Sequence, residues 1–449
     1  MYYYIFGKVI FMSEAKRTVG IYTLGCKVNQ YESEAIGELF AARGYEILPA
    51  DELCDVYIIN TCTVTAESDR KARQVVRRAI TRNPDAFVLV TGCLAQTAAE
   101  TLARIEGVDF VCGNTEKCAV VDAAERLLAS GCKNVHAEVR VASLEGAPFE
   151  PMRIQKFDRT RAYVKIEDGC ESHCTYCIIP KARGAIRSKK PSDVLDEVRA
   201  LTENGCREIV LTGIETASYG RDLDGYTLID LLEEVDRISG IGRVRLGSLD
   251  PSLMKPKFLE RLASLSSLAP HFHLSMQSGS DRILNLMKRK YNTAMALESI
   301  ERLREALPRV MLTTDMIVGF PTETEEDFSE TLAFAKRAEF LMIHVFPFSG
   351  RRGTPAAAMS GQVPMEVRRE RAARLASLEA SIRRDILDRE IRERPVCEVL
   401  FETCKNGYAI GHTDNFIEVT VKTNRDLHAR TASVRLLTTD GNTIEGEEI

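Results

Sequence analysis

Strand-like and helix-like patterns alternate along most of the 449-residue chain, and this alternation constrains the fold more than any other feature. Between residues 18 and 135, β-branched runs such as Val56–Asn60 and Phe87–Gly92 are separated by amphipathic stretches such as Ala66–Arg82. Strands interleaved with helices imply βαβ units, in which crossover helices join parallel strands. We therefore predict an α/β fold class with an N-terminal doubly wound parallel sheet over residues 18–135.

A second block of alternation follows a segment without periodicity. Residues 136–160 contain Gly146, Pro148 and Pro151, and we predict that they form a linker. Six βα units then span residues 161–380, which predicts either a partial (β/α)6 barrel or a second doubly wound sheet. The six candidate strands are Ala162–Ile166, Glu208–Thr212, Val244–Ser248, Phe272–Met276, Met311–Val318 and Met342–Phe346.

The pattern changes again near the C-terminus. A long, highly charged helical stretch is followed after Pro395 by short alternating runs, which predict a small antiparallel barrel within residues 381–449. The four runs are Cys397–Glu402, Tyr408–Gly411, Phe416–Val421 and Ala432–Leu437.

Composition excludes several classes of protein. Lys and Arg total 60 against 65 Asp and Glu, so a globally basic nucleic-acid coat is excluded while a local basic face is not. No run reaches the roughly 18 apolar residues that a membrane-spanning helix needs, so no membrane partner is expected. The apolar segment Met1–Met12 lacks the order of a secretory peptide, and we predict translation from Met12 and a cytoplasmic protein.

The 13 cysteines are expected to be reduced, because their number is odd and no export signal accompanies them. Three of them, Cys170, Cys174 and Cys177, lie within eight residues just after a candidate strand. One interpretation is a zinc knuckle completed by His173. The other is a [4Fe–4S] cluster in which three thiolates leave one iron open.

The residues around these cysteines favour the cluster. The run Gly169–Pro180 resembles the loop of radical S-adenosylmethionine (SAM) enzymes, including Tyr176 just before the last cysteine. In that family the open iron binds SAM, whose reductive cleavage yields a radical, on a partial (β/α) barrel. The resemblance further implies a SAM site with Gly213 and Glu215 at the end of the second barrel strand, and with Arg187 after the loop.

A second set of cysteines is dispersed along the chain. Cys26, Cys62 and Cys93 each follow a predicted strand of the first sheet at its carboxyl end, where open parallel sheets bind ligands. Adjacent parallel strands lie about 4.8 Å apart, so the three thiols can share one cluster. Cys54 and Cys112 compete for this role, and the three cysteines can also be small buried hydrophobic residues.

Longer motifs support the shared cluster. The runs Thr23–Glu34, Asn60–Thr65 and Thr91–Gln96 look like the N-terminal domain of the radical SAM methylthiotransferases, and the C-terminal runs resemble their RNA-binding TRAM barrel. The resemblance covers residues 18–440. The runs Gly247–Pro251 and His273–Ser280 resemble the branch that acts on N6-threonylcarbamoyladenosine in tRNA, although that branch usually has an aliphatic residue or His where this chain has Glu215.

This resemblance implies an enzyme with two [4Fe–4S] clusters, one auxiliary on Cys26, Cys62 and Cys93, which uses two SAM molecules per product. It inserts a methylthio group at C2 of the modified adenosine next to the anticodon (position 37). No catalytic residue beyond the cluster ligands is implied. The partners are the anticodon stem-loop of tRNA, an electron donor and a sulfur donor. Sister branches act on N6-isopentenyladenosine in tRNA or on an aspartate of a ribosomal protein.

Basic runs beside the predicted sites are candidate phosphate contacts, in keeping with RNA recognition. A rival hypothesis is a non-catalytic RNA-binding protein that holds structural zinc. The candidate contacts are Arg70, Lys71, Arg73, Arg77, Arg78, Lys181, Arg183, Arg187, Lys189, Lys190 and Lys288–Lys290.

Overall fold

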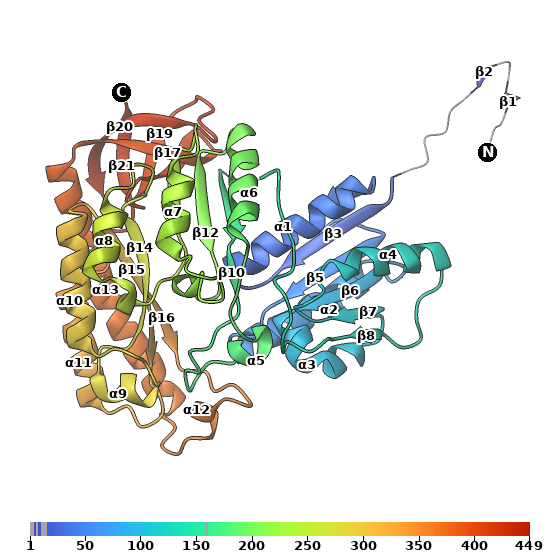
Figure 1. Ribbon diagram of the computed structural model, residues 1–449, viewed down its shortest axis with the longest axis horizontal. Coiled ribbons are helices and arrows are strands. Elements are labelled where there is room, and N and C mark those ends of the chain that lie inside the picture. Colours follow the sequence, from blue (N-terminus) through green and yellow to red (C-terminus); the bar gives the residue numbers. More distant parts are fainter. Residues whose placement is uncertain (1–3, 6–7, 10–15, 158–159) are drawn as a thin grey trace.

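The computed structural model describes residues 4–5, 8–9, 16–157 and 160–449, and its three parts follow the sequence (Figure 1). The predicted translation start, Met12, lies outside the described residues, as does Met1. The described N-terminal segments Tyr4–Ile5 (β1) and Lys8–Val9 (β2) pair antiparallel with each other.

The N-terminal part is a six-stranded, fully parallel sheet in the order β4-β3-β5-β6-β7-β8. Buried side chains of α1 and α4 pack on one face, and those of α2 and α3 pack on the other, so the sheet is doubly wound as predicted. The elements are β3 (Thr18–Thr23), α1 (Lys27–Ala42), β4 (Glu46–Leu48), β5 (Val56–Thr61), α2 (Ala66–Arg82), β6 (Phe87–Gly92), α3 (Cys93–Ala103), β7 (Phe110–Cys112), α4 (Ala119–Ser130) and β8 (Glu138–Arg140).

The central strands of this sheet are buried along their whole length. Every residue of β5 and β6 is buried, because helices cover both faces, which explains their unbroken apolar runs. The edge strand β8 is exposed at all three positions and lies within residues 136–160, which the sequence predicted to be a linker.

The central part is a partial barrel of six parallel strands. Two three-stranded sheets, β13-β12-β9 and β14-β15-β16, are joined by the parallel bridges Val244↔Leu268 and Leu249↔Leu274. The strands are β9 (Arg161–Lys165), β12 (Glu208–Thr212), β13 (Arg243–Leu246), β14 (His271–Gln277), β15 (Met311–Val318) and β16 (Met342–Pro347). The helices that cover them are α6 (Pro191–Glu203), α7 (Leu228–Asp236), α8 (Pro256–Ala263), α9 (Asp281–Leu286), α10 (Thr293–Ala306) and α11 (Glu325–Ala338).

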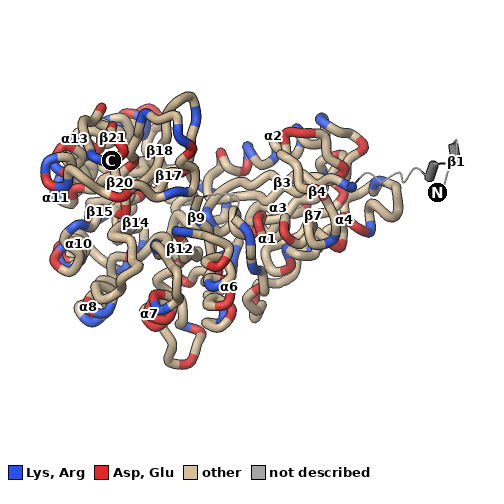
Figure 2. Tube along the Cα trace, turned by 90° about the horizontal axis from the view of Figure 1, so that it is seen from above, with Lys and Arg blue, Asp and Glu red and all other residues tan. Residues whose placement is uncertain are grey.

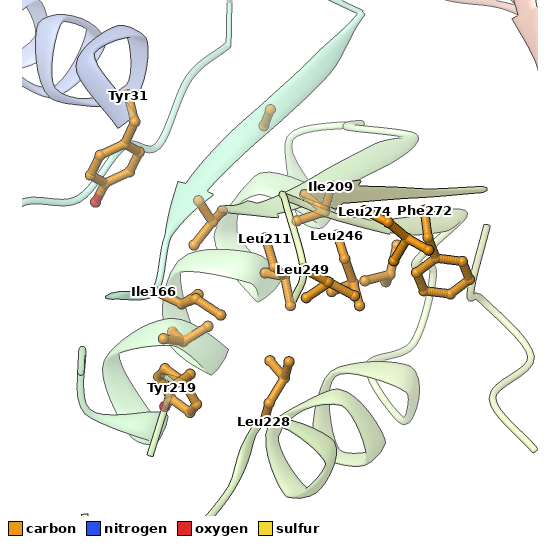
Figure 3. Close-up of a cluster of buried hydrophobic side chains, with 14 of the residues drawn as sticks. Tyr31, Ile166, Ile209, Leu211, Tyr219, Leu228, Leu246, Leu249, Phe272 and Leu274 are labelled. Carbon is orange, nitrogen blue, oxygen red and sulfur yellow. The ribbon is translucent and has the colours of Figure 1, made fainter. Parts of the chain in front are cut away.

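Apolar side chains of the first four barrel strands meet the helices in one core (Figure 3). Leu211, Leu246 and Leu274 lie side by side in this cluster, with Leu228 of α7 opposite them. The minor elements near the top of the barrel are β10 (Glu167–Asp168), α5 (Ile179–Arg183), β11 (Arg187–Ser188), the 3₁₀ turns Thr216–Ser218 and Pro251–Leu253, and α12 (Pro355–Ala358).

The C-terminal part is a closed five-stranded barrel in the order β17-β18-β19-β21-β20, consistent with the predicted TRAM-like fold. Contrary to the prediction, it is not wholly antiparallel, because β19 and β21 pair parallel. The barrel also begins later than predicted, since residues 381–393 belong to the preceding helix. The helix α13 (Met365–Glu393) leads into it and packs against β16 and β20. No helix among the described residues is long and apolar enough to cross a membrane. The strands are β17 (Val396–Lys405), β18 (Tyr408–Thr413), β19 (Glu418–Lys422), β20 (Thr431–Thr439) and β21 (Ile444–Glu448).

Candidate functional site

The three dispersed cysteines converge at the carboxyl edge of the N-terminal sheet. Cys26, Cys62 and Cys93 follow β3, β5 and β6, which are neighbours in the sheet, and β3 and β5 flank the point where the strand order reverses. Burial raises the pKa of Cys62 to about 11, and the nearby thiols of Cys93 and Cys26 add to this rise. The competing Cys54 lies before β5, at the opposite edge of the sheet.

A glycine makes this close approach of two loops possible. Gly25 has a φ of +107°, and a Cβ atom there would lie 2.7 Å from Cβ and 2.9 Å from Sγ of Cys62. An alanine would therefore meet both backbone strain and a clash. Asn29 holds the same turn, because its Nδ2 donates to the carbonyl oxygens of Leu24 (2.7 Å) and Thr61 (3.0 Å).

The second triad lies in the loop between β10 and α5, above the partial barrel. Each of its sulfurs accepts a hydrogen bond at 3.4 Å: Cys170 from the Ser172 amide, Cys177 from the Ile179 amide, and Cys174 from Nη1 of Arg289. Such donors favour the thiolate form that binds metal. Without metal, burial raises the pKa of Cys170 to about 12 and that of Cys177 to about 11.

The spacing of the thiols separates the two interpretations of the metal. Within the described part of the chain, one group of three His, Cys, Asp or Glu side chains has ligand atoms within 4.8 Å of one another, and it contains no cysteine. Thiolates around a single tetrahedral zinc lie about 3.8 Å apart. A [4Fe–4S] cube places its thiolates on separate irons and therefore needs the wider spacing. Neither cysteine triad is this compact, so the spacing of the thiols fits a cluster better than a single zinc ion.

Arg183 connects the two cysteine sites. Its guanidinium is fully buried, and Nε donates to Cys93 Sγ at 3.2 Å while Nη1 donates to Glu32 at 2.6 Å. Nη1 also reaches Asp168 beside the barrel loop, at 3.2 Å. This burial contradicts the hypothesis that Arg183 contacts phosphate. The sequence reasoning missed Glu32, although it stands six residues after Cys26 within the same motif.

Lysines complete this buried network. Lys165 donates to Glu32 and Asp168, each at 2.7 Å, and Lys117 also pairs with Glu32. The Arg183 guanidinium and the two ammonium groups oppose the effect of burial, and they hold the pKa of Glu32 well below its usual range. The N-terminal sheet and the barrel are therefore joined through ionised side chains.

The residues predicted at the SAM site lie around the barrel loop. Glu215 accepts from Ser172 Oγ at 2.8 Å and from the Cys170 thiol at 3.3 Å. A Cβ atom at Gly213 would lie 2.5 Å from Oε2 of Glu167, so the turn needs glycine. Tyr176 is half-buried and packs against the cluster of buried side chains around Met287 and Phe320.

Several buried polar atoms beside this loop lack partners among the described residues. Nε and Nη1 of Arg187 have none, while its Nη2 donates to the Arg183 carbonyl at 2.8 Å. Oε1 of Glu167 and the hydroxyl groups of Thr216 and Ser218 are likewise unpaired. Buried polar groups without partners point to a polar ligand at this place.

The basic runs divide into exposed and buried residues. Arg187 and Lys189 are buried, and Lys189 pairs with Glu197, so these two are not phosphate contacts. The side chain of Arg289 is 9% exposed and is committed to Cys174 and Asp250. The residues that remain exposed in these runs are Arg70, Lys71, Arg77, Arg78, Lys181, Lys190, Lys288 and Lys290.

Comparisons with known proteins agree with this arrangement. The family model described as the radical SAM superfamily matches residues 164–335, and the one described as uncharacterized protein family UPF0004 matches residues 18–113. The solved structure of the radical SAM methyltransferase TsrM from Kitasatospora setae has a TM-score of 0.54 at 15% identity, covering 76% of this chain and 77% of TsrM. At that identity the likeness shows the fold alone.

Relatives of known name match nearly the whole chain. The threonylcarbamoyladenosine tRNA methylthiotransferase MtaB of Bacillus subtilis is 41% identical over 430 residues, 94% of each chain. The protein of the same name from Aquifex aeolicus is 38% identical, covering 83% of this chain and 90% of its own. A tRNA-2-methylthio-N(6)-dimethylallyladenosine synthase from Aquifex aeolicus is 35% identical, covering 95% and 97%. The chain belongs to the radical SAM methylthiotransferase family.

Proposed function

We propose that the protein inserts a methylthio group at C2 of N6-threonylcarbamoyladenosine beside the anticodon of tRNA, as a radical SAM enzyme. The observation that carries this proposal is the 41% identity, over 94% of both chains, with a relative named for that reaction. Two cysteine triads at the facing edges of the two α/β parts support it, because the reaction needs both radical chemistry and a sulfur source.

We assign one cluster to each α/β part. Cys170, Cys174 and Cys177 would hold the cluster that binds SAM within residues 161–380. The auxiliary cluster would lie on the three cysteines of residues 18–135, and residues 381–449 would bind RNA. Tyr176, Gly213, Glu215 and Arg187 would line the SAM site, of which Arg187 offers two unpaired buried donors for a carboxylate.

When bound, the clusters and SAM supply the reducing electron and the radical chemistry that an unreactive C–H bond requires. The chain's own residues orient these groups. Arg289 and two backbone amides fix the sulfurs of the barrel loop, and Arg183 holds Cys93 against the barrel. The buried pair of Glu32 with Lys165 joins the N-terminal part to the barrel at this junction.

The proposed partners follow from this chemistry. Its substrate is tRNA, read at the anticodon stem-loop, and we propose a cytoplasmic location because tRNA is modified there. An electron donor must reduce the barrel cluster, and a sulfur donor must replace the sulfur that each turnover consumes.

The test is mass spectrometry of tRNA nucleosides from matched hosts with and without this protein. A methylthio gain on N6-threonylcarbamoyladenosine is the expected result. A gain on N6-isopentenyladenosine would keep the chemistry and overturn the substrate. If no tRNA nucleoside gains a methylthio group, the tRNA substrate is overturned, and the search moves to the ribosomal-protein aspartate.

A further inference from the structure

The inner face of the last three barrel strands carries polar side chains that the cluster sites do not use. His273 on β14, Asp315 on β15 and His344 on β16 have side-chain N and O atoms within 4.8 Å of one another. His273 Nε2 lies 3.4 Å from Asp315, and its Nδ1 lies 3.0 Å from the hydroxyl of Thr313. Asp315 and His344 are direct partners in the β15–β16 register.

An exposed aromatic ring lies one layer above this group. Phe346 follows His344 by two residues and therefore shares its face of β16. Both are exposed, Phe346 to 46%, whereas Ile343 on the opposite face is buried. A large exposed aromatic ring on an otherwise polar concave face is the platform on which proteins stack single-stranded bases.

An ammonium group from the other domain faces the same side chains. Lys27 directly follows the candidate cluster ligand Cys26 and is exposed. It lies within electrostatic reach of Asp315 and His344, and also of Arg161, Arg245 and their shared partner Glu208. Within the described residues it forms no ion pair. Figure 2 shows Lys and Arg positions gathering around β9, where the N-terminal part meets the barrel.

The polar group lies close below the barrel cluster loop. Arg289, whose Nη1 donates to Cys174 Sγ, also donates from Nη2 to the carbonyl of Ser275 at 3.0 Å. His273 is two residues earlier on the same strand, about 7 Å along it. A base held on Phe346 would therefore have the cluster loop on one side and the polar group on the other.

We propose that Phe346, His344, Asp315 and Lys27 form the specificity pocket for a purine whose N6 substituent carries a carboxylate and a hydroxyl group. Phe346 stacks on the base, Lys27 pairs with the carboxylate, and Asp315 with His344 binds the hydroxyl. The inference rests on the proposed function, because the threonylcarbamoyl group has both of these polar groups. An isopentenyl group has neither, and it would leave the Lys27 ammonium group desolvated without a partner.

The charges favour this occupant over a metal ion. Two histidines and a carboxylate are a donor set that divalent metals accept. Arg161 and Arg245 pair with Glu208, whereas Lys27 forms no ion pair within the described residues, so its positive charge attracts an anionic ligand and disfavours a cation.

The experiment measures the affinity of the oxidised holoprotein, under anaerobic conditions, for three synthetic anticodon stem-loops. They carry adenosine, N6-threonylcarbamoyladenosine or the methyl ester of the latter at the same position. Wild type is expected to bind the free acid about tenfold more tightly than the ester, because the ester removes one charge-assisted pair. Equal affinity for the acid and the ester would overturn the pocket, and this comparison requires no variant.

Lys27→Met is expected to lose the preference for the acid while binding the ester as wild type does. The matched control is Lys257→Met, an exposed lysine of α8 on the outside of the barrel, which is expected to keep the preference. A preference retained by Lys27→Met would overturn the assignment. The assignment would also be overturned if the wild type held a single metal ion in addition to the cluster iron and His344→Phe lost that ion. Nucleoside mass spectrometry tests the proposed function separately, so failure of the pocket and failure of the reaction are distinguishable.

Discussion

Single residues set the electrostatics of the junction between the two cysteine sites. The buried cations Arg183, Lys165, Lys117 and Arg187 outnumber the buried carboxylates Glu32 and Asp168, with which they pair, by four to two. An excess of buried positive charge is costly unless an anion faces it. Arg183 Nε points at Cys93 Sγ, so a thiolate or an anionic cluster supplies the missing negative charge.

Replacing Arg183 by Met should therefore weaken both the fold and the auxiliary cluster. The substitution leaves Glu32 and Asp168 with one cation fewer, and removal of one partner from a buried network costs about 3 kcal/mol. We expect a lower free energy of unfolding. We also expect about four iron atoms per chain in the variant, in place of the about eight that two clusters hold. Arg77→Met, on the exposed face of α2, is the control. Unchanged iron and stability would contradict the network.

The two triads should lose iron independently. The triple variant Cys26→Ala, Cys62→Ala and Cys93→Ala is expected to keep about four of about eight irons per chain, because each cube holds four. It should still cleave SAM and should insert no sulfur. Cys54→Ala is the control, since that thiol lies at the far edge of the sheet. A full iron content in the triple variant would disprove the auxiliary cluster.

Glu215 is expected to act on SAM affinity. Its carboxylate already accepts from Ser172 and Cys170, and the thiol proton leaves when Cys170 binds iron, which frees one carboxylate oxygen. Glu215→Gln should weaken SAM binding about tenfold by removing the charge that pairs with an ammonium group. Equilibrium dialysis of samples with equal iron content measures this. Glu171→Gln, exposed in the same loop, should bind SAM as wild type does.

At the scale of elements, the turn between β3 and α1 positions two of the ligands. Gly25→Ala places a methyl group within 3 Å of Cys62 at a φ of +107°, so we expect a loss of about 2 kcal/mol in the free energy of unfolding and loss of auxiliary iron. Gly44→Ala is the matched control, because Gly44 also has a positive φ, +88°, with no atom within 4 Å of the added methyl. Equal effects of the two substitutions would show that backbone strain alone matters.

Most strands and helices could be predicted because their periodicity is local. The predicted strand Phe87–Gly92 has the bounds of β6, and the six barrel strands lie within two residues of their predicted bounds at every end. The short edge strands β4 and β8 were missed, since their residues are mostly exposed and carry no apolar pattern. For residues 161–380 the sequence left two architectures open, and only the tertiary structure excluded the doubly wound sheet.

The candidate site divides in the same way. Convergence of the dispersed cysteines follows from the topology of a parallel sheet, so the sequence was sufficient to predict it. The partners of Arg183 were not predictable, because Glu32 lies 151 residues away and belongs to another domain. Charged runs in a sequence do not distinguish a solvated face from a buried junction, which is why the phosphate hypothesis was wrong for Arg183, Arg187 and Lys189.

In the whole molecule, the C-terminal barrel packs against the partial barrel at the amino-terminal ends of its strands. Phe416 stacks between His271 and His412, with ring centroids 4.4 and 4.7 Å away, and Arg245 lies 4.9 Å over its ring. Phe416 has a φ of +75°, a strained conformation that the surrounding contacts maintain. The C-terminal barrel is thus fixed to the partial barrel through a specific contact.

Glu208 is the buried carboxylate on which this contact depends. It accepts a hydrogen bond from Nε of Arg245 at 2.9 Å and lies 3.1 Å from Nε of Arg161. Both arginines also contact the C-terminal barrel: Arg245 donates to the Asp414 carbonyl, and Arg161 pairs with Glu402. Burial raises the pKa of Glu208, but the guanidinium groups of Arg245 and Arg161 more than offset this, so that its pKa falls to about 2.

Because this pKa lies below the value of about 4.5 in an unfolded chain, the stabilisation is present above that pH and is lost as the pH falls towards 2. Glu208→Gln should lower the free energy of unfolding by about 3 kcal/mol at pH 7, since two buried arginines lose their counter-charge. The difference from wild type should shrink between about pH 5 and pH 2, as measured by guanidinium unfolding at several pH values. Glu447→Gln, exposed on the last strand, should unfold as wild type does at every pH. A difference between Glu208→Gln and wild type that stays constant down to pH 2 would mean that the lost contact is one of packing and not of charge.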